Sequence, residues 1–150
     1  METRTYQVYK FKELSEDGQQ KALETLSDIN INYEWWDYLY DDANIIGLKI
    51  EEWDLYKRNI RGKLLESVGE VCRQILLNHG KRRGTYKLAQ DYYKKKFLNV
   101  PYIAEDFSYC LLQEYLSDLQ GAYDYLTSEE AIKETIDCNN YNFTEDGMID

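Results

Sequence analysis

Apolar residues recur at intervals of three and four along most of the chain, which is the spacing of amphipathic helices. This pattern predicts a first helix that begins after Ser15 and further helices over about residues 33–46, 67–79, 85–97, 104–126 and 128–139. Serine stands at three of these starts (15, 67 and 128), where a hydroxyl can cap the free backbone N–H groups. Gly47 is well placed to end the helix before it.

Shorter segments are rich in β-branched and aromatic residues or alternate between apolar and polar ones, which indicates strands. They cover residues 5–11, 48–55, 60–65 and 141–144. In the segment 48–55 the apolar residues change phase after Ile50, so we expect a β-bulge near Glu51 and Glu52 that returns them to one face. The predicted fold is α+β: a single domain over residues 1–150 with a small antiparallel sheet of three or four strands and five or six helices.

The composition supports a folded chain in spite of a mean hydropathy of −0.69. Fifteen tyrosines, four phenylalanines and three tryptophans are far more aromatic side chains than a disordered chain carries. The apolar runs are a few residues long, well below the ~20 that span a bilayer. No basic segment followed by an apolar run opens the chain, so we expect no signal peptide. We therefore expect a cytoplasmic protein without a membrane partner.

Cysteine and histidine are too few for the common catalytic and metal-binding patterns. Cys72, Cys110 and Cys138 are an odd number at wide spacing, which fits neither a disulfide framework nor a zinc site. Cys72 and Cys110 fall on apolar stripes and are expected in the core. His79 is the only histidine and precedes Gly80, where it can serve a helix C-terminus. The sequence predicts no catalytic residue, no metal and no cofactor, and we expect that the protein is not an enzyme.

The net charge of −10 conceals three segments of different sign. Residues 1–56 carry a net charge of −8, residues 57–96 one of +9, and residues 97–150 one of −11. One interpretation of the basic middle is a phosphate-binding surface, and the other is that the acidic flanks fold against it and neutralise it. The candidate phosphate-binding residues, here called the basic set, are Arg58, Arg61, Lys63, Lys81, Arg82 and Arg83.

A second candidate surface combines acidic and aromatic residues at and after the start of the helix expected over 33–46. Tyrosine and tryptophan are favoured interface anchors, and carboxylates would attract a basic partner. The alternative is an ordinary solvated helix face with aromatic core residues, which is the interpretation we prefer for Trp36 and Tyr40. The candidate partner-binding residues, here called the acidic–aromatic set, are Tyr33, Glu34, Trp35, Asp37, Tyr38, Asp41 and Asp42.

Several segments together resemble a known group of small proteins. They comprise residues 11–15, 33–37 through 47–50, 70–76, 125–130 and 141–147, and the Tyr-Glu-Trp-Trp run that begins at Tyr33 is the most distinctive. The chain resembles phage- and prophage-encoded proteins commonly labelled antitoxins of toxin–antitoxin stability systems. The resemblance implies a protein of a mobile element that acts in the bacterial cytoplasm by binding a target.

The first functional hypothesis is an antitoxin-like or anti-defence inhibitor, such as one of anti-CRISPR type, that blocks a bacterial toxin or immune effector through the acidic–aromatic set. The second is a sponge that sequesters a nucleotide signal in the basic middle, and a homo-oligomer with composite pockets would favour it. Direct nucleic-acid binding and enzymatic activity are minor alternatives.

Overall fold

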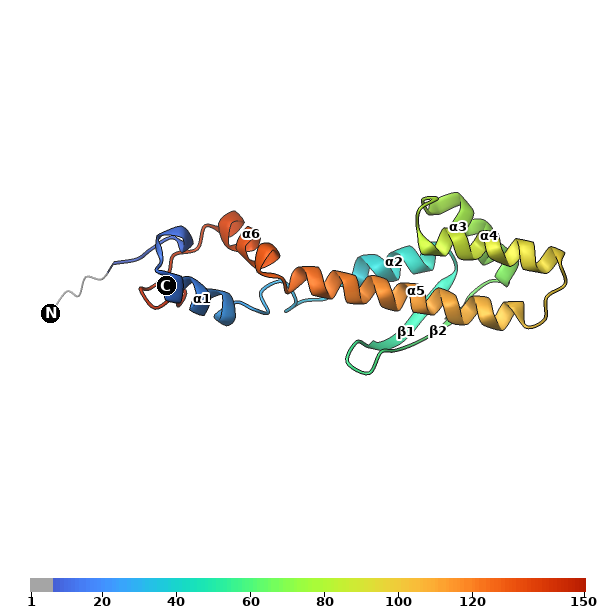
Figure 1. The fold of residues 1–150 in the computed structure, drawn as a ribbon, viewed down its shortest axis with the longest axis horizontal. Coiled ribbons are helices and arrows are strands. Elements are labelled where there is room, and N and C mark those ends of the chain that lie inside the picture. Colours follow the sequence, from blue (N-terminus) through green and yellow to red (C-terminus); the bar gives the residue numbers. More distant parts are fainter. Residues whose placement is uncertain (1–6) are drawn as a thin grey trace. The chain divides into compact units, whose positions relative to one another are not determined.

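The computed structural model describes residues 7–150, which form an α+β chain with six α-helices and one antiparallel hairpin (Figure 1). In chain order the elements are η1 (Phe11–Glu13), α1 (Glu16–Thr25), α2 (Asp37–Ile45), β1 (Leu48–Asp54), β2 (Asn59–Leu64), α3 (Val68–Asn78), α4 (Gly84–Phe97), α5 (Ile103–Leu126) and α6 (Glu129–Asn139). The expected five or six helices are confirmed. The chain length predicts a single domain, whereas the residues that the structure describes form two compact units. Unit 1 contains the described residues up to Trp35 together with residues 122–150, and unit 2 contains residues 36–121.

Unit 1 is built around a small core shared by η1, α1, α6 and the C-terminal segment. Ser15 and Ser128 cap α1 and α6, because their hydroxyls accept hydrogen bonds from the backbone N–H groups of Gly18 (3.1 Å) and Ala131 (3.2 Å). The apolar stripes of the two helices meet in a core that consists of Phe11, Leu14, Ala22, Leu23, Leu26, Ile132, Ile136 and Phe143.

The expected sheet of three or four strands is not confirmed, because in residues 7–150 the sheet has two strands. Residues 5 and 6 of the first expected strand lie outside the described residues, and the rest of that strand is reduced to a bridge between Tyr9 and Phe143. The last expected strand contributes only this bridge and one to Ile149. Pairing stops early because the chain turns into η1, where the Lys10 N–H donates to the Glu13 carboxylate (2.7 Å).

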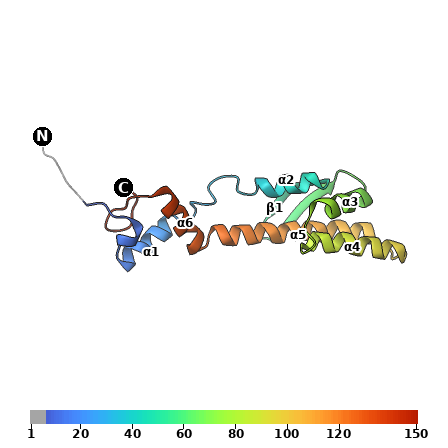
Figure 2. The same ribbon diagram turned by 90° about the horizontal axis from the view of Figure 1, so that it is seen from above.

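The hairpin of unit 2 is formed by β1 and β2. Its register shifts between Ile50 and Glu52, which confirms the predicted bulge. The shift leaves Ile50 buried and Trp53 half-buried on one face of the hairpin. The Trp53 ring lies edge-on to Trp36, with 5.4 Å between the centroids, so that β1 packs against the start of α2 (Figure 2).

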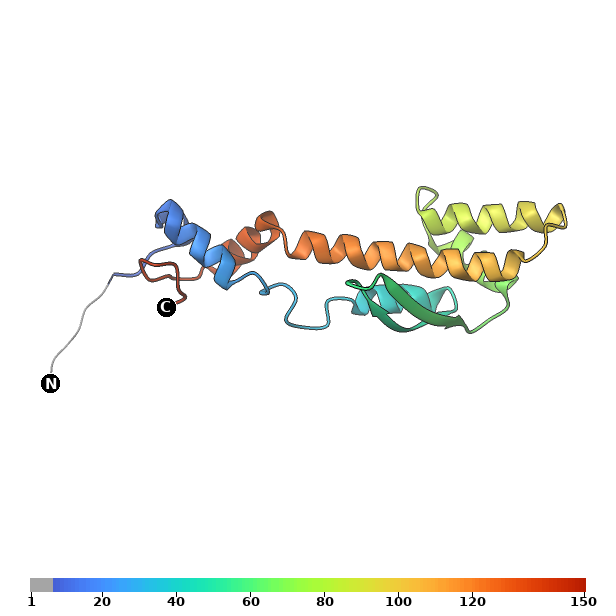
Figure 3. The same ribbon diagram turned by 60° about the horizontal axis from the view of Figure 1, so that its bottom comes forward.

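Helix α5 packs against the same hairpin at a glycine. A Cβ at Gly62 would lie 3.0 Å from the side chain of Leu112 and 2.5 Å from the carbonyl oxygen of Lys49, so only glycine permits this approach. Helices α4 and α5 run side by side (Figure 3), and the Tyr92 and Phe107 rings lie 5.6 Å apart between them. The core of unit 2 contains Ala43, Ile46, Leu48, Ile50, Val71, Cys72, Ile75, Ala89, Tyr92, Phe107, Leu111 and Tyr115.

Local signals set the ends of the helices in unit 2. Gly47 has a φ of +89° and follows α2, as its position in the sequence predicts. Ser67 caps α3 by accepting a hydrogen bond from the Glu70 N–H (3.2 Å). The Glu70 carboxylate accepts two hydrogen bonds from Arg73, which together with Gln74 lower its pKa to about 2. None of the helices in residues 7–150 has both the length and the apolar character needed to cross a membrane.

Candidate functional site

The two units divide the acidic–aromatic set between them. Tyr33, Glu34 and Trp35 belong to unit 1, whereas the four remaining residues lie on α2 in unit 2. Trp35 is only 7% exposed and packs on Tyr123, with 6.0 Å between the rings, so its ring is part of a core. Tyr33 and Glu34 are exposed.

The outer face of α2 carries most of the set that lies in unit 2. Asp37, Tyr38 and Asp41 are exposed, and Ile45 one turn further along is exposed as well. Asp42 differs, because a helix turns about 100° per residue and this side chain is directed toward α3, α4 and α5. The outer face of α2 therefore presents two carboxylates, one tyrosine ring and one aliphatic side chain to solvent.

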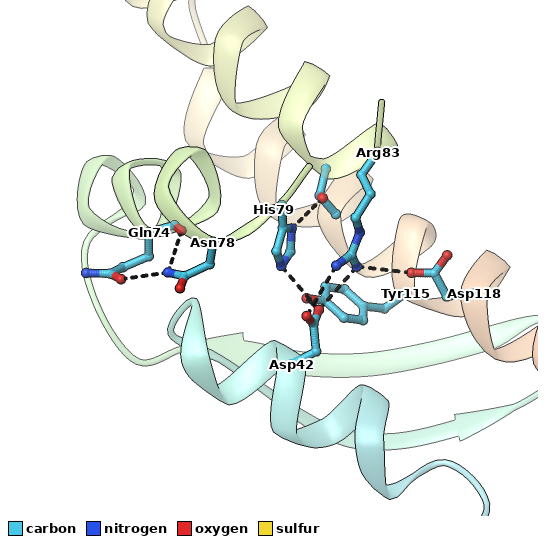
Figure 4. A network of polar contacts seen from close by, with 8 residues as sticks. Asp42, Gln74, Asn78, His79, Arg83, Tyr115 and Asp118 are labelled. Atoms are coloured by element: carbon cyan, nitrogen blue, oxygen red, sulfur yellow. Dashed lines mark hydrogen bonds and ion pairs between the residues drawn. The ribbon is translucent and has the colours of Figure 1, made fainter. Parts of the chain in front are cut away.

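Asp42 is the centre of a polar network that joins the four helices of unit 2 (Figure 4). Arg83, at the N-cap position of α4, donates from Nη1 to Oδ1 and from Nη2 to Oδ2, both at 3.2 Å. The Tyr115 hydroxyl of α5 donates to Oδ2 at 2.6 Å. Burial alone would raise the pKa of Asp42, but the contacts from His79, Arg83 and Tyr115 outweigh it and hold this pKa well below its usual range.

His79 connects α3 to the same carboxylate from a position that is almost fully buried. Its Nδ1 lies 2.6 Å from the Thr85 hydroxyl, and its Nε2 lies 3.2 Å from Oδ2 of Asp42 in a geometry too poor for a hydrogen bond. A proton on Nε2 faces the carboxylate favourably and leaves Nδ1 to accept from Thr85, so we assign that tautomer. Thr85 is 1% exposed, so this arrangement offers no reachable nucleophile and serves to join the helices.

Asp118 completes the network in a less favourable position. Its Oδ2 accepts a long hydrogen bond (3.4 Å) from Nη2 of Arg83. The same guanidinium already donates two shorter hydrogen bonds to Asp42. Burial raises the pKa of Asp118, and the carboxylates of Glu114 and Asp42 raise it further against the opposing effect of Arg83. For Tyr115, burial and the bond to Asp42 raise the pKa, so its hydroxyl remains protonated.

An open cavity of about 400 Å³ lies over this network and is lined by Tyr38, Leu39, Asp42, Arg83 and Asp118. Its wall holds two carboxylates and one guanidinium, which gives a local charge of −1. Because Arg83 is already engaged by Asp42 and Asp118, the cavity suits a cationic group, such as a lysine or arginine of a partner, better than a phosphate.

The basic set does not form one cluster. Arg58, in the hairpin turn with a φ of +52°, and Arg61 and Lys63 of β2 lie on the hairpin, whereas Lys81, Arg82 and Arg83 lie between α3 and α4. The hairpin turn and this loop lie on opposite sides of α5 (Figures 1 and 3). Two members are paired with acids, since Arg83 binds Asp42 and Arg61 forms an exposed ion pair with Glu52 (3.2 Å). At these two positions, acids of the first segment of the chain lie against the basic middle.

Sequence reasoning missed Thr85, Tyr115 and Asp118 as members of a site. Tyr115 falls on the apolar stripe of the long helix, and the signal available was that a buried tyrosine hydroxyl needs a partner. Nothing local indicates the pairing of Asp42 with Arg83, 41 positions away in the chain.

The remaining sequence expectations concern metals and cysteines. No group of three or more histidine, cysteine, aspartate or glutamate side chains within residues 7–150 is placed to hold a metal ion. Cys72 is fully buried, as expected, and burial raises the pKa of its thiol to about 12. Cys110 is half-buried and Cys138 is exposed.

The geometry of the site is the main guide to function. No protein-family model matches the sequence, and no curated protein or solved structure shows significant similarity to it.

Proposed function

We propose that this protein is an antitoxin-like or anti-defence inhibitor that binds the basic, nucleic-acid-facing site of a bacterial toxin or immune effector in the cytoplasm of its host. The observation that carries the proposal is the outer face of α2, where Asp37, Tyr38 and Asp41 are exposed together. Neither carboxylate forms an ion pair with any residue of 7–150. An acidic face with an aromatic anchor is complementary to a surface that normally binds phosphates.

The cavity beside this face extends the proposed contact. Asp118 is a carboxylate whose ionised form the fold disfavours, and a lysine or arginine of the partner would relieve that cost. Asp42 has a different role, because its carboxylate is occupied by Arg83 and Tyr115. We assign Asp42 to positioning α2, and the contact to Asp37, Tyr38, Asp41 and Asp118.

Charge reversal on α2 tests the proposal. The wild-type chain, the double variant Asp37→Lys/Asp41→Lys and the matched double variant Glu24→Lys/Asp28→Lys are immobilised and used to capture proteins from a host lysate. The matched pair is exposed in unit 1 and makes the same change in net charge. We expect a target that wild type and matched variant retain and that the α2 variant loses, with an affinity at least about ten-fold weaker at low salt.

The captured target must also meet the chemistry of the proposal. Purified, it should bind nucleic acid, and a polyanion such as heparin should displace it from the inhibitor. The proposal fails if the α2 variant captures the same proteins with unchanged salt dependence. It also fails if the target bound through α2 has no polyanion-binding site.

A nucleotide sponge is the second candidate, because Lys81 and Arg82 are exposed beside one another and form no ion pair with residues 7–150. Calorimetry with cyclic and linear nucleotides tests it, and Lys81→Ser/Arg82→Ser should abolish any heat of binding. An absence of heat with the wild-type chain at high concentration rejects this candidate.

A further inference from the structure

The turn between α4 and α5 exposes several apolar side chains next to one another in the chain. Phe97 is 86% exposed, Leu98 62% and Tyr102 76%, and Val100 is also exposed. The turn lies at the end of the α4–α5 pair, with no other element of unit 2 beyond it (Figures 1 and 3). Single exposed apolar residues are ordinary, but four of them within six positions of one turn suggest an interaction surface.

The backbone of this turn is held in an unusual conformation. Helix α4 ends with the Val100 N–H donating to the carbonyl of Lys95 (3.0 Å) and the Asn99 N–H to that of Lys96 (3.1 Å), while Asn99 has a φ of +56°. Tyr102 has a φ of +60°, which asparagine tolerates and a tyrosine rarely adopts. Glycine or asparagine would adopt this backbone conformation with less strain than the tyrosine does.

Three lysines stand directly before the exposed side chains. Lys95 is paired with Asp91 (2.9 Å), whereas Lys94 and Lys96 are exposed and form no ion pair with residues 7–150. Glu105 and Asp106 follow in the first turn of α5 and oppose this charge.

We propose that the α4–α5 turn binds the surface of an anionic bilayer. Phe97, Leu98 and Tyr102 would enter the interface, and Lys94 and Lys96 would contact the lipid phosphates. Apolar side chains beside lysines are the combination by which surface-bound proteins attach to anionic lipid, since neither contribution suffices alone. The expectation of no membrane partner rests on the absence of a spanning segment among the apolar runs, and binding to a bilayer surface requires no such segment.

Other occupants fit the same side chains less well. Nucleic-acid bases could stack on Phe97 and Tyr102, but Leu98 and Val100 would gain little from them, whereas a bilayer interface accepts all four. A second copy that docked turn to turn could cover the apolar side chains but would offer Lys94 and Lys96 no phosphate groups to contact. The bilayer therefore uses both the apolar and the basic features of the turn.

Co-sedimentation of the full chain with vesicles tests the proposal. We expect binding to phosphatidylcholine vesicles that contain about 30% phosphatidylglycerol at about 50 mM salt, and much weaker binding without the anionic lipid or at about 300 mM salt. Lys94→Ser/Lys96→Ser should reduce partitioning about 25-fold, which is about five-fold per lysine. Phe97→Ser/Leu98→Ser should reduce it at least about ten-fold, and Glu105→Gln should increase it.

Matched variants elsewhere in unit 2 control for general effects. Tyr56→Ser/Leu77→Ser removes two side chains of comparable exposure, and Lys49→Ser/Lys57→Ser removes two exposed lysines of the hairpin that lie outside the basic set. Both should bind like wild type, and circular dichroism should show that all variants are folded. The proposal is overturned if wild type does not sediment with anionic vesicles, or if the control variants lose as much binding as the turn variants. It is also overturned if a single-stranded oligonucleotide binds through Phe97 and Leu98 and vesicles do not displace it.

Discussion

Asp42 joins four helices through one carboxylate. It lies on α2 and contacts the residue that ends α3, the residue that precedes α4, and a buried tyrosine of α5. An acid in this position is unavailable to a partner, although the sequence groups it with the exposed acids of the same helix. The network instead determines how α2 sits against the rest of unit 2, and with it the orientation of the proposed binding face.

Stability of the fold should depend on pH through Asp42. Its folded pKa lies well below the value of about 3.9 for an unfolded chain, so its contribution is complete above about pH 5 and is lost as the pH falls through 4 toward the folded pKa. Asp42→Asn should lower the free energy of unfolding at pH 7 by about 2–3 kcal/mol, less than for a fully buried pair because the side chain is 29% exposed. The measurement is chemical denaturation of both proteins between about pH 2 and 7.

The difference in the free energy of unfolding between wild type and Asp42→Asn separates the effect of Asp42 from that of the other titrating acids. It should shrink below about pH 4, where Asp42 itself becomes protonated in the unfolded state. Glu70→Gln is the comparison variant, because Glu70 also has a lowered pKa but lies on the surface in a contact within α3. A difference for Asp42→Asn that stays constant across the range would contradict the assignment.

Asp118→Asn should have the opposite effect. The folded pKa of Asp118 is raised, so its ionised form opposes folding once the pH exceeds the unfolded value of about 3.9. The amide can still accept from Arg83 while it removes the repulsion by Asp42 and Glu114. We expect a gain of about 0.5 kcal/mol at pH 7, limited by solvent screening because the side chain is 41% exposed. Thermal unfolding of the variant measures it, and a loss of stability would show that the ion pair with Arg83 dominates.

At the scale of elements, two glycines that are both in close contact should respond differently to alanine. In Gly62→Ala the new Cβ would meet the backbone oxygen of Lys49, which cannot move without disturbing the hairpin, so we expect a loss of about 1–3 kcal/mol. In Gly84→Ala it would meet only the Glu114 carboxylate, the flexible end of a side chain, and α4 gains helix propensity in return. Denaturant unfolding should show a large loss for the first variant and little change for the second.

The elements that the sequence predicts well are those determined by neighbouring residues. The capped starts of α1, α3 and α6, the glycine after α2 and the bulge of β1 follow from patterns a few positions long. The extra strands are not confirmed, because strand pairing depends on distant segments, and here the chain enters η1 after one bridge. The site also depends on pairing between distant residues. The sequence shows that Asp42 is an acid and Arg83 a base, but only the fold brings them into contact.

At the scale of the whole molecule, only some of the charged residues of the basic middle form ion pairs with the acidic segments. Arg61 and Arg83 are neutralised by acids from the first segment of the chain, which accounts for two of the six residues of the basic set. Asp37 and Asp41 of α2, and Lys94 and Lys96 at the end of α4, are exposed and form no ion pair with residues 7–150. Two charged surfaces of opposite sign on one chain suit two different partners, which is why the inhibitor proposal and the bilayer proposal can be tested by separate variants.

The two units have separate hydrophobic cores, so a cavity in one core should lower protection against hydrogen exchange mainly within the same unit. Phe143→Ala removes a fully buried ring of unit 1 at a cost of about 3–5 kcal/mol, and Leu111→Ala removes a fully buried side chain of unit 2 at about 2–5 kcal/mol. Amides of α1 should exchange faster in the first variant and amides of α3 in the second, as measured by mass spectrometry under native conditions. If either variant accelerates both helices equally, the chain unfolds as one cooperative body and the cores are not energetically separate.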